Sequence, residues 1–227
     1  KYLIPGAEGL VLSNNQITDI TPLKKLFDKT ENGGSLEVYL SDNQIEDISA
    51  FDTFTGHFRL LDLSNNHITD ISALANITSF HILGLSNNQI ADISSLNNLT
   101  DVNYLSLDNN ELTNVDALSN LTEVWQTLDL SNNHINDISG LSNLKNLTHL
   151  NLSNNQLTNV DGLSSLTEIA YKLDLSNNEL TNINGLSNLT WVSGILDLSN
   201  NQISDVTPLS GLLKLYSLGL NGNPVED

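Results

Sequence analysis

Apolar residues follow the same order again and again along this chain. In a typical stretch, Leu61 and Leu63 alternate with polar residues, and a polar Ser-Asn-Asn turn follows them. Ile68, Ile71 and Leu74 come next, at intervals of three residues. Alternation places one face of a short strand inward, whereas a spacing of three suits a tight helical turn or an irregular arc. Each unit is therefore predicted to be a strand, a turn and an arc that returns the chain to the next strand.

This unit recurs ten times, and an asparagine marks each copy. The intervals between these marker asparagines are 28, 23, 22, 22, 23, 22, 23, 23 and 22 residues. The markers are Asn15, Asn43, Asn66, Asn88, Asn110, Asn133, Asn155, Asn178, Asn201 and Asn223. A period of 22 or 23 residues is typical of leucine-rich repeats. The pattern predicts one α/β solenoid domain over residues 1–227, a right-handed leucine-rich-repeat superhelix of about ten coils. We expect a concave parallel β-sheet on one side and short 3₁₀ or irregular segments on the convex side.

The markers and the arc residues have structural interpretations. A buried Asn amide offers two donors and an acceptor, so we expect a ladder of marker amides that satisfies backbone groups where the chain turns inward. Thr precedes Pro in Thr21-Pro22 and Thr207-Pro208, which is typical of an N-cap followed by the first helical residue. Serine is expected to cap the other arcs, at Ser49, Ser72, Ser94 and Ser139.

The coil over residues 150–163, Leu-Asn-Leu-Ser-Asn-Asn-Gln-Leu-Thr-Asn-Val-Asp-Gly-Leu, resembles a short repeat class shared by two families. One is the bacterial internalins, cell-surface proteins that bind host receptors through the concave face. The other is the eukaryotic phosphatase-regulator type, which is intracellular. The Ile-Thr-Asp-Ile-Ser-x-Leu phrase and the Asn-Leu-Thr joints are more similar to the bacterial branch. The resemblance therefore implies a binding protein that is extracellular or on the cell surface rather than cytoplasmic.

Three features depart from the internalin pattern. A helical cap and a following immunoglobulin-like domain are not visible, so we expect the chain to be a fragment that lacks its terminal caps. Open strand edges are templates for association, and self-association through uncapped ends is a possible consequence. Several coils also carry an extra residue before the strand, as around Trp125 and Trp191.

The net charge of the chain argues against two classes of partner, nucleic acids and membranes. Lys and Arg number 8 against 27 Asp and Glu, a formal net charge of −19, which repels phosphate backbones and anionic lipid surfaces. We expect neither nucleic-acid binding nor membrane insertion. The chain has no cysteine and its five histidines are scattered, so no metal and no cofactor are expected. A shallow sheet also lacks the enclosed cleft that catalysis prefers, so an enzyme is not expected.

The outward strand positions are the candidate partner-binding residues. Leu60, Ile82 and Tyr104 share one column on successive coils with Tyr39 nearby, and we interpret them as a binding hot spot; the alternative is that they only lean on a neighbouring loop. Asp129, Asp174 and Asp197 share a second column with Asn151, beside Ile195. This column is predicted to be a docking surface for a basic partner or simply a solvated acidic face.

Together these features predict a protein–protein recognition module that is adhesin-like, on a bacterial cell surface or secreted, and that uses its concave face. Two alternatives stay open. The chain could be a structural subunit that assembles into a surface array or filament, or an intracellular regulatory scaffold.

Overall fold

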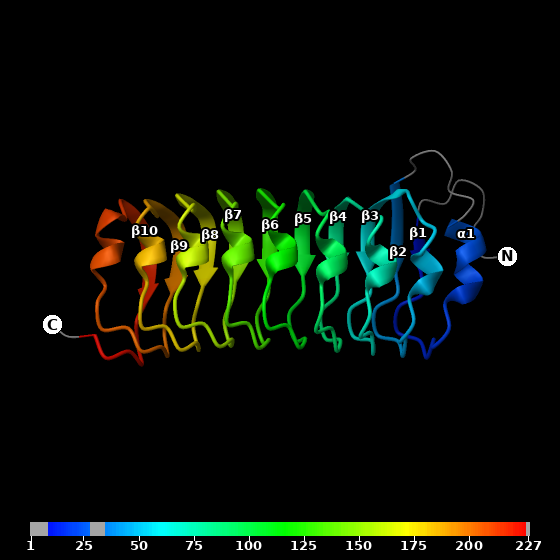
Figure 1. The fold of residues 1–227 in the computed structure, drawn as a ribbon, viewed down its shortest axis with the longest axis horizontal. Helices are drawn as coiled ribbons and strands as arrows, with labels where there is room; N and C mark the ends of the chain where they lie inside the picture. Colours follow the sequence, from blue (N-terminus) through cyan, green and yellow to red (C-terminus); the bar gives the residue numbers. More distant parts are fainter. Residues whose placement is uncertain (1–8, 28–34, 226–227) are drawn as a thin grey trace.

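A computed structural model describes residues 9–27 and 35–225, and the coils lie side by side in a single row (Figure 1). Within these residues, ten strands form one parallel sheet in chain order, β1 to β10. The strands are β1 (Gly9–Val11), β2 (Ser35–Tyr39), β3 (His57–Asp62), β4 (Ser79–Gly84), β5 (Asp101–Ser106), β6 (Glu123–Asp129), β7 (Asn146–Asn151), β8 (Glu168–Asp174), β9 (Trp191–Asp197) and β10 (Lys214–Gly219). Each strand pairs only with the strands of adjacent coils, as expected for a solenoid.

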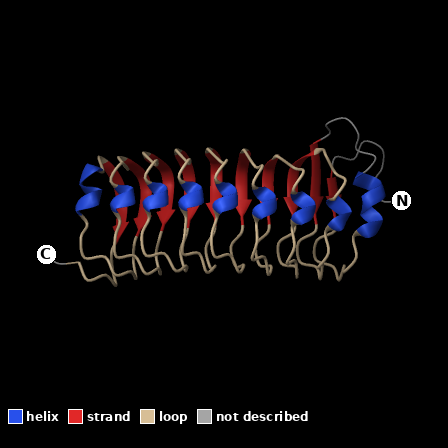
Figure 2. Cartoon of the chain, viewed as in Figure 1, coloured by secondary structure: helices blue, strands red, loops and turns tan. Residues whose placement is uncertain are grey.

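The opposite side of the solenoid carries short helical turns, which line up in one row across from the strands (Figure 2). The 3₁₀ turns of the described residues are η1 (Thr21–Leu23), η2 (Ser49–Phe51), η3 (Ser72–Leu74), η4 (Ser94–Leu96), η5 (Asp116–Leu118), η6 (Ser139–Leu141), η7 (Asp161–Leu163), η8 (Asn184–Leu186) and η9 (Thr207–Gly211). One short α-helix, α1 (Lys24–Phe27), follows η1. The predicted leucine-rich-repeat solenoid, with its parallel sheet and 3₁₀ turns, is confirmed. Among the described residues, no helix has the length and apolarity that crossing a membrane requires.

A continuous column of aliphatic side chains fills the space between the sheet and the turns. In the central coil, Leu105, Leu107, Leu112, Val115 and Leu118 are all fully buried. The five phenylalanines of the chain depart from this aliphatic pattern. They gather in the N-terminal coils, where their ring centroids lie 4.3–6.1 Å apart. Aromatic packing therefore reinforces the coils beside α1.

The marker asparagines hold successive coils together. Asn133 is buried, and its Nδ2 donates to the carbonyls of Leu130 and Ser131 in its own coil and of Leu107 in the preceding one, at 3.0–3.1 Å. Its Oδ1 accepts from the backbone N–H of Leu112 at 3.0 Å. The residue before each of the first nine markers has a positive φ of 53–57°. Asn and Asp tolerate this left-handed conformation best among non-glycine residues, which accounts for the paired Asn-Asn or Asp-Asn.

The prediction that Thr or Ser caps the 3₁₀ turns is wrong. The N-cap position is held by an apolar residue such as Ile48, with no side-chain cap bond, and Ser49 is already the first residue of the turn. The acceptor is instead Asp47, whose Oδ1 takes the backbone N–H of Ser49 at 2.7 Å. An Asp or Asn two residues before the turn makes the same bond to η1 through η9.

Candidate interaction surface

Strand pairing aligns the outward positions of the sheet into two columns. The first column runs from Glu37 through Leu60, Ile82, Tyr104, Thr127, His149, Lys172 and Ile195 to Ser217. The second runs from Tyr39 through Asp62, Gly84, Ser106, Asp129, Asn151, Asp174 and Asp197 to Gly219. Adjacent residues of a column are about 4.8 Å apart because neighbouring strands have this spacing. We refer to this side of the sheet as the open face.

The N-terminal half of the open face carries an apolar patch, Leu60, Ile82 and Tyr104, which pair directly on β3, β4 and β5. All three side chains are half-buried. Gly84 and Ser106 stand beside them in the second column. Because these two residues are small, nothing in the second column overhangs the patch on β4 and β5.

A polar group lies next to this patch on β2 and β3. The Tyr39 hydroxyl donates to Glu37 Oε2 at 3.3 Å, and Arg59 lies 3.0 Å from Glu37 Oε1. Burial, together with the negative charge of Glu37, raises the pKa of Tyr39. Tyr39 is thus held at the edge of the apolar patch in its neutral form.

The C-terminal half of the open face carries the acidic column, Asp129, Asn151, Asp174 and Asp197. Each of the three aspartates accepts two bonds at Oδ1 from the serine two residues later: the backbone N–H at 3.0 Å and the hydroxyl at 2.6–2.7 Å. Asn151 accepts the same pair of bonds from Ser153, at 3.2 and 2.8 Å. These side chains are therefore fixed in orientation, and a neutral amide makes the same two bonds as a carboxylate at this position.

One lysine of the first column, Lys172, lies beside the acidic column. Lys172 Nζ is 2.8 Å from Asp174 Oδ2. Burial raises the pKa of Asp174, but the bonds from Lys172 and Ser176 outweigh it, so that the pKa lies below its ordinary value. The bond to Asp174 also raises the pKa of Lys172. Both groups are charged near neutral pH, and one carboxylate of the column is already paired.

Sequence reasoning did not select three exposed aromatic residues on β6, β8 and β9. Trp125, Tyr171 and Trp191 are 62%, 53% and 41% exposed. Trp125 and Tyr171 lie where the register shifts, because β6 and β8 each have one residue more than the strand before them, β5 and β7. The Tyr171 ring lies over His149 of the open face, with centroids 4.6 Å apart. The feature of the sequence that could have revealed them is the extra residue that several coils carry, as around Trp125 and Trp191.

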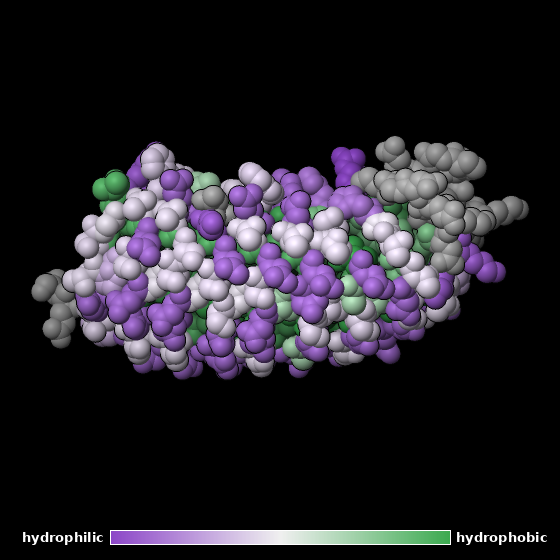
Figure 3. Space-filling view, turned by 45° about the horizontal axis from the view of Figure 1, so that its top comes forward, coloured by the Kyte–Doolittle hydropathy of each residue, from purple (hydrophilic) through white to green (hydrophobic). Residues whose placement is uncertain are grey.

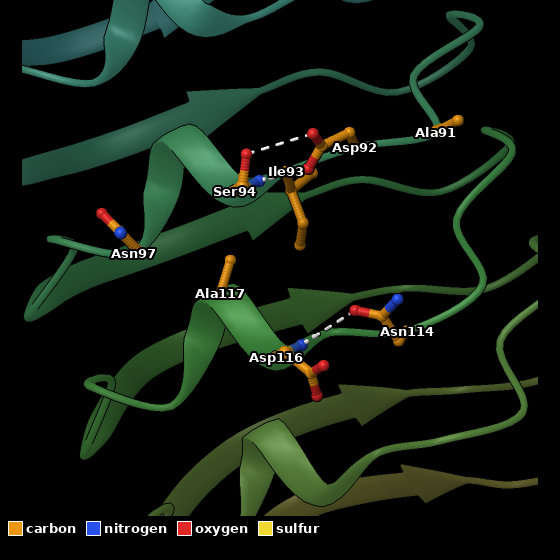
Figure 4. Close-up of a pocket in the computed structure, with 8 residues that line it drawn as sticks. All are labelled: Ala91, Asp92, Ile93, Ser94, Asn97, Asn114, Asp116 and Ala117. Atoms are coloured by element: carbon orange, nitrogen blue, oxygen red, sulfur yellow. Dashed lines mark hydrogen bonds between the residues drawn. The ribbon is translucent and has the colours of Figure 1, made fainter.

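On the turn side, open grooves lie between successive 3₁₀ turns. The groove between η4 and η5 contains Asp92, Ser94 and Asp116, and the hydrogen bonds drawn there hold the starts of the two turns (Figure 4). Similar grooves recur between η2 and η3 and between η6 and η7. Hydrophilic side chains dominate this side of the surface (Figure 3). The grooves are therefore a product of the repeat. No group of three or more potential metal ligands occurs in the part of the chain that the structure describes.

Comparison with known proteins agrees with this geometry. Residues 59–98 and 126–165 match the family model described as Leucine Rich repeats (2 copies). A comparison with curated proteins gives no match. The plant peptide hormone receptor RGFR1, solved in complex with RGF2, shares the fold at 23% identity and a TM-score of 0.62, over 95% of this chain and 40% of that one. Proteins of this fold are typically protein-interaction modules rather than enzymes.

Two internalins from Listeria monocytogenes are more similar in sequence. The internalin InlF has 31% identity and a TM-score of 0.78, over 97% of this chain and 68% of that chain. Internalin C2 has 30% identity and a TM-score of 0.66, over 94% of this chain and 80% of that chain. On the strength of these two likenesses, the chain belongs to the internalin family of leucine-rich-repeat proteins.

Proposed function

We propose that the chain is the recognition module of a bacterial cell-surface or secreted protein and binds a partner protein through the open, concave face of its sheet. The observation that carries this proposal is the apolar patch. Leu60, Ile82 and Tyr104 lie side by side on three paired strands, yet their side chains are only half-buried. Clustered apolar and aromatic side chains on an otherwise polar surface are typical of the centre of a protein interface.

The dimensions of the sheet suit a protein partner. Ten strands at about 4.8 Å give a face on the order of 45 Å long, and a stable interface needs about 800 Å² from each partner. The residues proposed to contact the partner are Tyr39, Leu60, Ile82, Tyr104, Asp129, Asp174, Asp197 and Ile195. Because strand pairing fixes them in two columns, little backbone entropy would be lost when a partner binds.

The test is capture of a partner from cell-surface extracts by the immobilised chain. The variant Tyr104→Lys, Ile195→Lys places two charges on the open face and leaves the buried core unchanged. The matched control is Gln89→Lys, Gln202→Lys, which adds the same charge at exposed residues that follow marker asparagines. We expect a protein that the parent and the control capture and that the open-face variant loses. Capture of the same protein by all three would refute the use of this face.

A second candidate function, assembly with further copies, is favoured by a different observation. Leu213, just before β10, and Tyr216, within it, are 87% and 85% exposed, and a pair of exposed apolar side chains promotes association. Light scattering of the parent and of a Leu213→Ser, Tyr216→Ser variant tests this. Concentration-dependent growth that the variant abolishes would favour assembly, whereas a monomer throughout would exclude it.

A further inference from the structure

The exposed rings of Trp125, Tyr171 and Trp191 form a feature that we call the aromatic shelf. They lie on β6, β8 and β9, the strands that carry the aspartates of the acidic column: Trp191 is the first residue of β9, Trp125 the third of β6 and Tyr171 the fourth of β8. Each ring lies three to six positions before the aspartate of its own strand, which corresponds to about 10–20 Å in an extended chain. Large exposed rings are costly to leave in water, and here the fold inserts extra residues that present two of them. Exposed rings that share neighbouring strands with charged side chains offer a surface for a partner.

The acidic column beside the shelf also exceeds what the fold needs. Asn151 makes the same two bonds to its serine as the aspartates do, so that a neutral amide suffices there. Aspartate nevertheless occupies the position on β6, β8 and β9, in a chain whose net charge is already −19. Like charges on neighbouring strands repel one another. The fold can use the acceptor oxygen of these aspartates, but it does not need their negative charge.

The lysines of the chain show which chemistry this surface accepts. Lys172 lies 2.8 Å from Asp174 Oδ2, and Lys214 Nζ lies 4.4 Å from the centroid of the Trp191 ring. Both distances are typical of attractive contacts of an ammonium group, with a carboxylate in one case and with an aromatic face in the other. The remaining aspartates, Asp129 and Asp197, and the remaining rings, Trp125 and Tyr171, offer the same two kinds of contact.

We propose that the shelf and the acidic column together bind a basic segment of a partner protein. Its Lys or Arg side chains lie over Trp125 and Tyr171 and pair with Asp129 and Asp197. This inference rests on the proposed function and adds the chemistry of the partner to it. Charge complementarity carries the choice of occupant, because a chain with 27 acidic and 8 basic side chains attracts a cationic partner and repels nucleic acid or anionic lipid. Arginine suits both the aromatic shelf and the acidic column, because a planar guanidinium stacks on aromatic rings and also bonds to carboxylates.

The probe is a labelled peptide of alternating Arg and Ser, with a Lys-Ser peptide and a Glu-Ser peptide for comparison, titrated by fluorescence anisotropy. The variant Asp129→Asn, Asp197→Asn removes two charges and keeps the acceptor oxygens, as Asn151 shows the fold allows. Its control is Glu111→Gln, Glu179→Gln, which removes the same charge from exposed side chains without a hydrogen bond in the described residues. We expect the first variant to bind the Arg-Ser peptide about three- to tenfold more weakly than the control does. Equal weakening of both variants would mean diffuse attraction by net charge and would overturn the proposal.

A second pair of variants tests the shelf. Trp125→Ala, Tyr171→Ala should weaken binding of the Arg-Ser peptide by about two- to fivefold per ring and reduce the preference for Arg over Lys. Because both rings are exposed, the far-UV circular dichroism spectrum and the melting temperature should stay unchanged. Unaltered affinity with both rings removed would overturn the role of the shelf.

The outcomes separate this inference from the proposed function. If Tyr104→Lys, Ile195→Lys abolishes capture of the cell-surface protein while Asp129→Asn, Asp197→Asn captures it fully, the open face binds a partner that is not recognised by charge, and only the present inference fails. If the Arg-Ser peptide binds selectively but no cell-surface protein is captured, the surface chemistry holds and the proposed function fails.

Discussion

Removing one marker amide from the middle of the solenoid should destabilise the whole domain. The substitution Asn133→Ala deletes the bonds from Nδ2 to three carbonyls and the bond from the Leu112 N–H to Oδ1. The amide has two N–H groups, so two donated bonds and one accepted bond are lost in effect. A buried polar group left without its partner costs about 1–3 kcal/mol. With relaxation of the turn, we expect a loss of about 3–5 kcal/mol in the free energy of unfolding.

The first marker supplies the matched control. Asn15 is exposed, and among the residues that the structure describes its Nδ2 donates to the carbonyls of Leu12 and Ser13 in its own coil, each at 3.0 Å. Water can replace these bonds, so Asn15→Ala should cost about 1 kcal/mol or less. Urea unfolding followed by circular dichroism measures both losses. The account of the ladder is refuted if the two substitutions differ by less than about 1 kcal/mol, since the bonds between coils would then contribute little.

Two further predictions concern close packing and pH. A Cβ at Gly185 would lie 1.9 Å from the Val160 carbonyl oxygen, so Gly185→Ala should cost about 1–3 kcal/mol by overpacking, whereas Gly211→Ala, whose Cβ would meet only a 3.6 Å contact, should leave the melting temperature nearly unchanged; equal melting temperatures for the two variants would contradict this. The pKa of Asp174 is lowered in the folded state, so its charged form stabilises the fold above the unfolded value of about 3.9, and this contribution is lost as pH falls through the folded pKa. Asp174→Asn should therefore be less stable than the parent in urea at pH 7 and equal to it near pH 2; a difference that persists at the lower pH would show that charge is not its source.

Most of the fold was predictable because one constraint acts ten times. The marker interval fixes the coil length, the alternation of Leu61 and Leu63 fixes which side of the strand faces inward, and stacking then aligns the outward residues. The pairing of Leu60 with Ile82 follows from these rules alone. Because nearly the same residue pattern recurs in every coil, the architecture of the whole domain could be predicted from one coil.

The prediction of the caps failed because a serine that caps a turn and a serine that begins it look alike in sequence. Ser49 resembles an N-cap, but the turn begins on that residue and Asp47 supplies the acceptor; the recurrence of Asp or Asn two residues earlier was the available signal. The aromatic shelf was missed for a different reason. The extra residue beside Trp125 was visible, but an insertion does not reveal which side chain a register shift will turn outward.

The most direct test of the account is photo-crosslinking from a single defined position. A photoreactive phenylalanine at Ile82, on the open face, is compared with the same residue at Ala117, in the groove on the turn side. The chain is incubated with intact cells, irradiated and recovered. We expect a discrete covalent product with a cell-surface protein from position 82 and none from position 117. A product from position 117 alone, or identical products from both, would contradict recognition through the open face of the sheet.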